Sequence, residues 1–530
     1  MKASANSPAA TSGSFLPCVF SLAACLMFST VCLAAPSITL SKKTGPPTSQ
    51  ILVSGRGFEP NVGVDIYFDT KDEVLVVTDG QGRFEKAKGY APKQARPGQH
   101  WVTALERNND KGAQMPFLVQ TDWPQFHFEA DGTRLNPYEN VLTPKTVRGL
   151  GLRWSYKTGS AVFTAPALAN GVVYVGSSWP EFSIYALNAS TGAKLWSYDT
   201  GGDVLSSPAA ADGVVYVGSD GGGGLYALNA KTGRMLWTYP IDVYTSSPTV
   251  ENGVLYVGSV YSNSVYALDA KTGHELWSYD TGAFVQSSPA VVNGVVYVSA
   301  GGGGLGNDGV LYALNAKTGS KLWSYPIGGC CKESAPTPAY LQHTSESSPA
   351  VADGVVYVGS WDGTVYALNA ASGALLWSYA TGGDISSSPA VAKEVVYIGS
   401  FYIGSGNSST YALNARTGAL LWATNIGSGE NSPAVANGVV YLGSWDNNVY
   451  ALNASTGAVL WSYATGTHVE CSPTVVNGKV YVGSDDDNVY AFALTDNGRS
   501  KQDAASKRPD PTTLRPDFGF KATAETSLKH

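Results

Sequence analysis

The sequence predicts an all-β protein, with a closed eight-bladed β-propeller of four-stranded antiparallel blades after a small β-sandwich. A unit recurs between about residues 152 and 494, and it is clearest at Ser347–Tyr379. There, four runs (SSPAV, VVYVGS, VYALNA and LLWSY) alternate with Gly, Asp and Asn. Such β-branched and aromatic runs between turn residues are typical of an antiparallel meander. One meander cannot bury both its faces, so the copies must stack or close into a ring.

The number of blades follows from recurring prolines and tryptophans. Each copy opens with one of eight prolines: Pro166, Pro208, Pro248, Pro289, Pro349, Pro389, Pro433 and Pro473. Each fourth run carries one of eight tryptophans: Trp154, Trp196, Trp237, Trp277, Trp323, Trp377, Trp422 and Trp461. Trp154 precedes the first proline, whereas no such tryptophan follows Pro473. Because pairing the spare strand with the incomplete last copy removes two sheet edges, Leu152–Tyr156 is predicted to complete blade eight.

A turn with the pattern Asn-Ala-x-Thr-Gly follows the third run, as at Asn188–Gly192. An Asn side chain can cap such a turn, and Gly can adopt the positive φ that closes it. The tryptophan four residues beyond this Gly is expected to wedge between neighbouring sheets, because a ring has no core at its centre.

The N-terminal residues 1–35 are predicted to be a signal peptide. Phe15–Ala35 is almost wholly apolar and ends in small residues, a pattern typical of cleaved secretory signals. A membrane anchor is the alternative. Leu22–Cys25 also matches a lipoprotein cleavage box, which would make Cys25 a lipidated N-terminus. We expect a secreted or periplasmic protein with no membrane span after cleavage.

The remainder of the chain falls into regions that differ in amino-acid composition and in strand pattern. Short alternating strands at residues 36–122 predict a β-sandwich, and SGRGFEP followed by VDIYFD resembles bacterial immunoglobulin-like modules. Residues 123–150 form a connector that could run along one face of the propeller at 151–495. The polar residues 496–530 predict a disordered tail. The net charge of −7 makes nucleic acid an unsuitable partner.

Residues just before each Ser-Pro should rim one mouth of the central channel. In order they are Phe163, Leu205, Thr245, Gln286, Glu346, Ser386, Glu430 and Glu470. Their three acids fall on one arc, with Asn431, Cys471 and His468 nearby. Carboxylates and an amide could hold Ca²⁺, and a hydrated acidic funnel is the alternative. Asp485–Asp487 lacks the spacing of a calcium loop and is interpreted as solvated turn acids.

Loops on the same face carry aromatic and acidic residues. The candidates for partner binding are Trp179, Tyr261, Trp361, Asp362, Tyr402, Trp445 and Asp446. On a rigid scaffold these residue types favour recognition of a peptide or a carbohydrate.

The ALNAxTGxxLW motif, the eight copies and WPQF near residue 123 resemble the quinoprotein-type (PQQ-like) β-propeller repeat family. That family includes PQQ-dependent alcohol dehydrogenases and propellers without cofactor, such as the lipoprotein subunit of the outer-membrane β-barrel assembly machinery. The dehydrogenases carry a vicinal cysteine pair against the cofactor. On that resemblance, the residues that could hold PQQ and calcium are Cys330, Cys331, Glu346, Glu430, Asn431 and Glu470.

Two features weaken the dehydrogenase interpretation. The residues after Cys330-Cys331 lack the acid-rich continuation expected in those enzymes, and most blades lack large loop elaborations. We therefore expect an exported, non-catalytic scaffold that binds a protein or polysaccharide, without cofactor, metal or catalytic residues. The alternative is a PQQ- and calcium-dependent alcohol or sugar dehydrogenase with its cofactor at the channel mouth.

Overall fold

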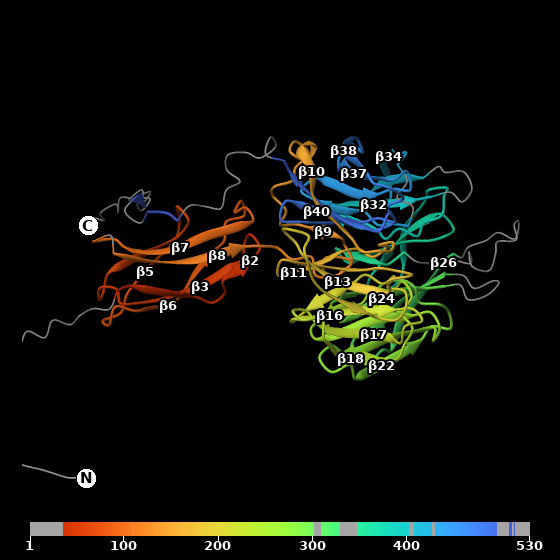
Figure 1. Cartoon of the computed structure of the whole chain (residues 1–530), viewed down its shortest axis with the longest axis horizontal. Coiled ribbons are helices and arrows are strands. Elements are labelled where there is room, and N and C mark those ends of the chain that lie inside the picture. Colours follow the sequence, from red (N-terminus) through yellow and green to blue (C-terminus); the bar gives the residue numbers. More distant parts are fainter. Residues whose placement is uncertain are drawn as a thin grey trace, which may run out of the picture.

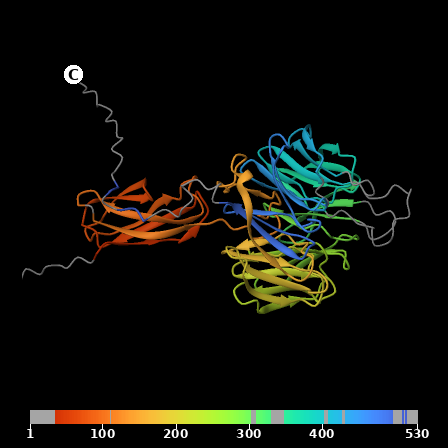
Figure 2. The same cartoon turned by 45° about the horizontal axis from the view of Figure 1, so that its top comes forward.

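A β-sandwich lies beside a ring of eight β-sheets in the computed structural model of the chain (Figure 1). The two stay side by side in a second view (Figure 2). The structure describes residues 35–109, 111–301, 309–328, 347–401, 408–426, 430–495, 508–510 and 513–514. The predicted signal segment up to residue 34, with Cys25, lies outside the described residues. Within those ranges, no helix has the length and apolarity needed to cross a membrane.

Two sheets that share one core form the sandwich. One contains β1 (Ser37–Leu40), β3 (Gln50–Arg56) and β6 (Phe84–Tyr90). The other is ordered β2 (Thr44–Gly45), β8 (Gly112–Val119), β7 (Gly98–Glu106), β4 (Gly63–Phe68) and β5 (Lys71–Val77). Alternation along β3 buries Ile51 and Val53, which pack in one cluster with Phe117 from the facing sheet. The closer likeness to immunoglobulin-like modules stays a prediction.

Eight sheets of consecutive antiparallel strands form the ring, as predicted. Blades one to four are β11 (Ala167–Ala169), β12 (Val172–Gly176), β13 (Ser183–Asn188), β14 (Lys194–Asp199); β15 (Ala209–Ala211), β16 (Val214–Ser219), β17 (Gly224–Asn229), β18 (Met235–Tyr239); β19 (Thr249–Glu251), β20 (Val254–Ser259), β21 (Ser264–Asp269), β22 (Glu275–Asp280); and β23 (Ala290–Val292), β24 (Val295–Ala300), β25 (Gly309–Asn315), β26 (Lys321–Gly328). Blades five to seven are β27 (Ala350–Ala352), β28 (Val355–Gly359), β29 (Thr364–Asn369), β30 (Leu375–Ala380); β31 (Ala390–Ala392), β32 (Val395–Ser400), β33 (Ser409–Asn414), β34 (Leu420–Thr424); and β35 (Ala434–Ala436), β36 (Val439–Gly443), β37 (Asn448–Asn453), β38 (Val459–Ala464).

Blade eight closes the ring with a strand from the start of the array. It consists of β39 (Thr474–Val476), β40 (Lys479–Gly483), β41 (Asn488–Leu494) and β10 (Leu150–Lys157), which follows the short 3-10 helix η1 (Val147–Gly149). In the β10–β41 pair, Leu152 lies opposite Phe492 and Tyr156 opposite Val489. The predicted closure is therefore confirmed.

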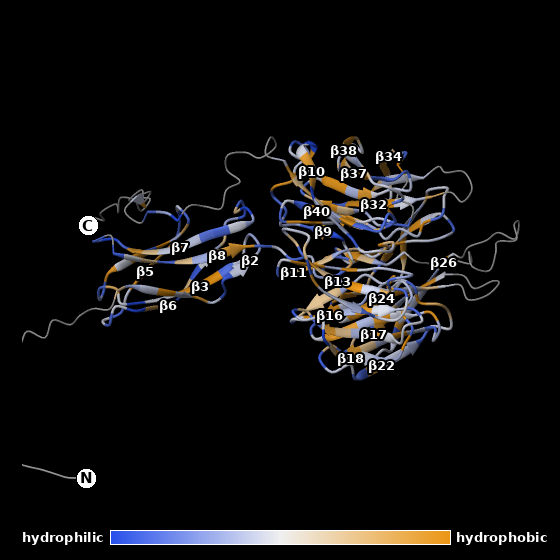
Figure 3. Cartoon of the chain, in the orientation of Figure 1, coloured by the Kyte–Doolittle hydropathy of each residue, from blue (hydrophilic) through white to orange (hydrophobic). Residues whose placement is uncertain are grey.

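Hydrophobic packing lies between blades rather than on the ring axis. Tyr216 and Leu225 of blade two form one cluster with Leu255 and Leu268 of blade three. Apolar residues follow strands such as β24 and β37, whereas hydrophilic residues gather in the turns (Figure 3).

Tryptophans of the outer strands join neighbouring blades. The indole Nε1 of Trp196 donates a hydrogen bond to the Ala230 carbonyl of the next blade at 3.0 Å. Gly233 has a φ of 70°, and a Cβ there would lie 2.6 Å from the Trp196 ring. The turn therefore needs glycine both for its backbone conformation and for space. The equivalent indole bond recurs from Trp154, Trp237, Trp277, Trp323, Trp377, Trp422 and Trp461.

The Ser-Ser-Pro opening found in most copies is also structural. The second serine accepts a hydrogen bond from the same position of the preceding blade, as from Ser207 N to Ser247 Oγ at 3.0 Å. The first serine acts within its own blade, where Ser206 Oγ accepts from Gly218 N at 2.8 Å. Both contacts satisfy buried backbone N–H groups.

Residues described near the C-terminus contact the sandwich. Leu514 is buried against Tyr67 and Leu105 of the sandwich, and the Arg508 guanidinium lies 5.3 Å from the Trp101 ring centre. The prediction of a disordered tail for residues 496–530 stays a prediction.

Candidate binding face at the channel mouth

One end of the central channel opens into a cavity of about 440 Å³. Seven of the eight predicted rim residues line it: Phe163, Leu205, Thr245, Gln286, Ser386, Glu430 and Glu470. The eighth, Glu346, lies outside the described residues, as do Cys330 and Cys331. Each rim residue lies three residues before the proline at which the chain enters an innermost strand, so the ring brings equivalent positions together.

The charged groups of this cavity are acidic. Asp203, Glu430 and Glu470 line it, and no Lys or Arg belongs to the described residues that do so. Acidic walls favour cations over carboxylate-bearing ligands. The described part of the mouth is therefore suited to a cation or to a neutral group.

Two polar residues that were expected near the acids form hydrogen bonds with backbone groups of blades seven and eight. Asn431 is buried, its Oδ1 accepts from Gly443 N and its Nδ2 donates to Val469 O, both at 3.2 Å. Cys471 Sγ accepts from Gly483 N at 3.0 Å, and burial raises the pKa of this thiol to about 12. Both residues take the place of the first serine in Ser-Ser-Pro. The expectation that Asn431 offers an oxygen ligand at the mouth stays a prediction.

The connector runs around the inside of the ring and bounds the cavity through Phe126. Between Trp123 and Asn136 it forms hydrogen bonds with every innermost strand, each time at the residue two positions after the proline. In order, these partners are Leu168, Ala210, Val250, Val291, Val351, Val391, Val435 and Val475. At its end, β9 (Leu135–Asn136) pairs in parallel with β35. A path along one face was expected, and the path within the ring was missed.

Arg134 fixes this path with a fully buried side chain. Its Nε donates to Pro433 O at 2.8 Å, its Nη2 to Pro473 O at 3.1 Å, and its Nη1 to Phe126 O. Burial lowers the pKa of Arg134 to about 9. The guanidinium therefore joins blades seven and eight to the connector and does not line the mouth.

An aromatic row, consisting of Trp361, Phe401, Trp445 and His468, crosses blades five to eight. Ring centres lie 5.7 Å apart for Trp361–Phe401, 5.6 Å for Phe401–Trp445 and 6.2 Å for Trp445–His468, the last pair nearly parallel. Phe401 also forms a β-bridge with Asp384, two residues before the rim residue Ser386. The row therefore lies on the face of the mouth.

Only part of this row was predicted. Trp361 and Trp445 were candidates, but Phe401 was missed because its neighbour Tyr402 was chosen, and Tyr402 lies outside the described residues. The available signal was position, since Phe401 follows β32 as Trp361 follows β28 and Trp445 follows β36.

Exposure separates the other candidates. Trp179 and Tyr261 are 72% and 66% exposed, whereas Trp361 is only 6% exposed. Trp179 and Tyr261 thus offer large accessible aromatic surfaces at the loops of blades one and three. Trp361 acts mainly as a packing residue under its loop.

The two candidate aspartates have partners within their own blades. Asp362 accepts a hydrogen bond from Tyr366 Oη, and Asp446 accepts one from Tyr450 Oη, each at 2.7 Å. Both are exposed. Each carboxylate is therefore exposed to solvent and also accepts a hydrogen bond within its own blade.

The interpretation of Asp485–Asp487 as solvated acids is wrong for Asp485. Its Oδ1 is buried without a hydrogen-bond partner. Burial, together with the charges of Glu470 and Asp486, raises the pKa of Asp485 to about 7. Asp486 has a structural role, because its Oδ2 accepts from Gly466 N and from Tyr490 Oη.

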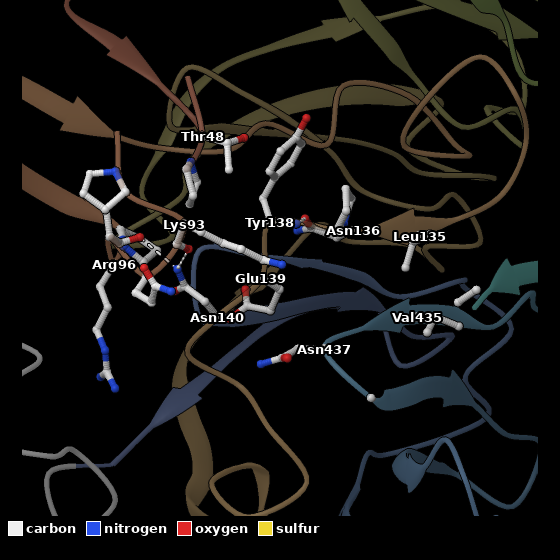
Figure 4. A pocket seen from close by; sticks show the side chains of 18 of the residues that line it. Thr48, Lys93, Arg96, Leu135, Asn136, Tyr138, Glu139, Asn140, Val435 and Asn437 are labelled. Atoms are coloured by element: carbon white, nitrogen blue, oxygen red, sulfur yellow. Dashed lines mark hydrogen bonds between the residues drawn. The ribbon is translucent and has the colours of Figure 1, made fainter. Parts of the chain in front are cut away.

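A second cleft, of about 1670 Å³, lies between the sandwich and the propeller (Figure 4). Lys93 and Arg96 line it from the sandwich, and Asn437 from the turn after β35. Within it, Asn140 Nδ2 donates to Ala95 O at 2.8 Å, and buried Glu139 accepts from Gly478 N at 2.9 Å. The connector thereby links both parts at the end of the ring opposite the mouth. No candidate residue was predicted here.

The fold and the repeats define a PQQ-like-repeat β-propeller. Residues 151–243, 242–402 and 406–515 match the family model described as outer membrane protein assembly factor BamB. These segments cover more than half of the chain, which therefore belongs to this family. No curated protein matches the sequence.

The solved structures with the same fold are named as proteins of different kinds. A quinohemoprotein alcohol dehydrogenase from Comamonas testosteroni is 19% identical, with 73% of this chain and 82% of that chain covered and a TM-score of 0.59. A europium-containing methanol dehydrogenase is 16% identical over 71% and 98% of the chains, with a TM-score of 0.59. BamB from Moraxella catarrhalis is 20% identical over 65% and 99%, with a TM-score of 0.52. At such identities the likeness shows the fold alone.

Proposed function

We propose that this chain is an exported, non-catalytic scaffold that binds a protein partner through the face of the channel mouth. The observation that carries the proposal is the exposure of two aromatic side chains on that face, Trp179 at 72% and Tyr261 at 66%. The aromatic row packs across blades five to eight, with Trp361 and Phe401 buried. Trp and Tyr are the residue types that dominate binding energy at protein interfaces. The family match and the apolar N-terminal segment support a role in the cell envelope.

A protein suits this face better than a polysaccharide. Sugar rings stack on neighbouring exposed aromatic faces, whereas the exposed Trp179 and Tyr261 lie on the loops of blades one and three, and Trp361 is 6% exposed and packs edge-on against Phe401. Asp362 and Asp446, which could bind hydroxyl groups, already accept hydrogen bonds from tyrosines.

The described mouth residues do not fit PQQ. This cofactor carries several carboxyl groups, and the cavity presents Asp203, Glu430 and Glu470 without a lysine or arginine among its described lining residues. The nearest buried guanidinium, Arg134, is bound to three backbone carbonyls. We therefore derive no redox step.

Site-specific photo-crosslinking tests the proposal. A photoreactive residue at position 179 or 261 should give a discrete protein adduct in intact cells. Position 236 is the matched control, because Leu236 is 49% exposed on the outer strand of blade two. Equal adducts at all three positions, no adduct at 179 and 261, or a carbohydrate adduct would contradict the proposal. So would substrate-dependent dye reduction after reconstitution with PQQ and Ca²⁺.

A further inference from the structure

Three side chains of metal-binding types meet beside the channel mouth. They are His468 and Glu470, from the connection between blades seven and eight, and Asp485, from the loop after β40. One potential ligand atom from each lies within 4.8 Å of the others. His468 is exposed, and the two carboxylates are partly buried.

The Asp485 carboxylate is the least satisfied group of the three. Its Oδ1 has no hydrogen-bond partner although that atom is buried. A buried carboxylate oxygen without compensation is costly. Glu470 places a second carboxylate close by. A cation between these groups would remove both penalties.

The backbone and a neighbouring ring hold the imidazole near the carboxylates. The His468 carbonyl accepts hydrogen bonds from Asp485 N at 3.1 Å and from Ser484 Oγ at 3.0 Å. The His468 ring lies almost parallel to Trp445, with planes 19° apart. The strands that flank these residues, β38, β39, β40 and β41, belong to blades seven and eight. The three candidate ligands therefore lie on short connections between strands.

We propose that His468, Glu470 and Asp485 bind a divalent transition-metal ion of the Zn²⁺ type. An imidazole with two carboxylates favours zinc over calcium or magnesium, which prefer oxygen ligands alone. Zinc lies about 2.0–2.2 Å from such ligands, so two of them are at most about 4.4 Å apart. Atoms within 4.8 Å need only a small side-chain rotation to reach one ion. The site shares Glu470 with the predicted calcium arc but not its other members.

This site stands apart from the proposed partner. Metal binding requires neither the partner nor Trp179 and Tyr261, so either proposal can fail alone.

Calorimetric titration of the full, metal-free chain with Zn²⁺ tests the inference. Cys330 and Cys331 are replaced by serine beforehand, so that thiolates do not compete for the metal. We expect one ion per chain, bound at least about tenfold more tightly than Ca²⁺ or Mg²⁺. His468→Ala and Asp485→Asn should each weaken zinc binding at least about tenfold. His274→Ala is the matched control, because His274 is exposed on a turn of blade three.

Three results would overturn the inference. These are an absence of stoichiometric zinc binding, unchanged affinity in both His468→Ala and Asp485→Asn, or tighter binding of Ca²⁺ that His468→Ala leaves intact. If Asp485→Asn failed to fold, His468→Ala would still decide, because an exposed ring can be removed without opening the core.

Discussion

The indole Nε1 of Trp461 donates a hydrogen bond to the backbone carbonyl of Leu150, 3.1 Å away. In the other blades the equivalent tryptophan reaches the alanine of the next Asn-Ala turn. Trp461 finds no such turn, because β10 has entered blade eight from the other end of the array. Strand β10 thus provides both the fourth strand of blade eight and the carbonyl that accepts the hydrogen bond from Trp461.

Closure makes Trp154 important for stability. It is 8% exposed, and its Nε1 donates to Ala189 O at 3.3 Å. We expect Trp154→Ala to lower the free energy of unfolding by roughly 3–5 kcal/mol, since it leaves a large cavity at the closure. Urea unfolding measures this. Trp179→Ala, at a 72% exposed site, should change stability by less than about 0.5 kcal/mol; an equal loss in both variants would refute the role of closure.

A comparison of Gly192 with Gly213 separates the cost of a positive φ from the cost of a steric contact. Both have positive φ, 73° and 80°, but a Cβ at Gly192 would lie 2.7 Å from the Trp154 ring, whereas one at Gly213 meets nothing within 4 Å. Gly213→Ala should cost about 1 kcal/mol through its conformation alone. Gly192→Ala should cost roughly two to three times as much, because the indole must also move. Thermal unfolding of both variants checks the difference, and similar melting temperatures would show that the contact relaxes freely.

The repeated parts of the molecule were predictable because they recur. The phases of Trp154 and Pro473 were enough to predict which strand closes the ring, and the shared position before Ser-Pro predicted that Glu430 and Glu470 line one cavity. These inferences need only the spacing of residues within a repeat.

Features without a repeat were not predictable. The connector between Trp123 and Asn136 bonds largely through backbone groups, which leave no residue pattern. The burial of Asp485 depends on blade geometry around His468. The hydrogen bonds of Asn431 were not predictable, because the sequence gives its position in the repeat but not the direction of its amide.

Arg134 should be essential for the connector. Its guanidinium binds the carbonyls of Phe126, Pro433 and Pro473. Arg134→Ala leaves these acceptors unpaired in a buried position, so we expect a loss of at least roughly 3 kcal/mol in urea unfolding. Arg134→Lys should not restore stability, because a single ammonium cannot span the three acceptors.

The control for Arg134 is another arginine. The Arg416 side chain is 80% exposed and forms a 3.2 Å ion pair with Glu394. Since an exposed ion pair contributes about 0–1 kcal/mol, Arg416→Ala should leave stability nearly unchanged. A full rescue by Arg134→Lys would show that charge alone, rather than the fork of donors, holds the connector.

His100 should make the stability of the sandwich depend on pH. Burial alone would lower its pKa, but hydrogen bonds to the Asp69 carboxylate and the Arg96 carbonyl outweigh it and raise the pKa above the usual value. Nδ1 lies 2.6 Å from Asp69 Oδ2, and Nε2 lies 2.7 Å from Arg96 O. Both partners are acceptors, so the ring is held as the imidazolium.

Because the folded-state pKa exceeds the unfolded one, this stabilisation is complete below the unfolded value of about 6.5 and is lost as pH rises through the folded value. Urea unfolding of the wild type should therefore show stability falling as the pH rises above about 6.5. His100→Gln, which keeps one hydrogen bond but cannot titrate, should flatten that slope. His274→Gln, at an exposed turn, should retain it. An unchanged slope in His100→Gln would assign the pH dependence to another group, since no other change was made to the sandwich.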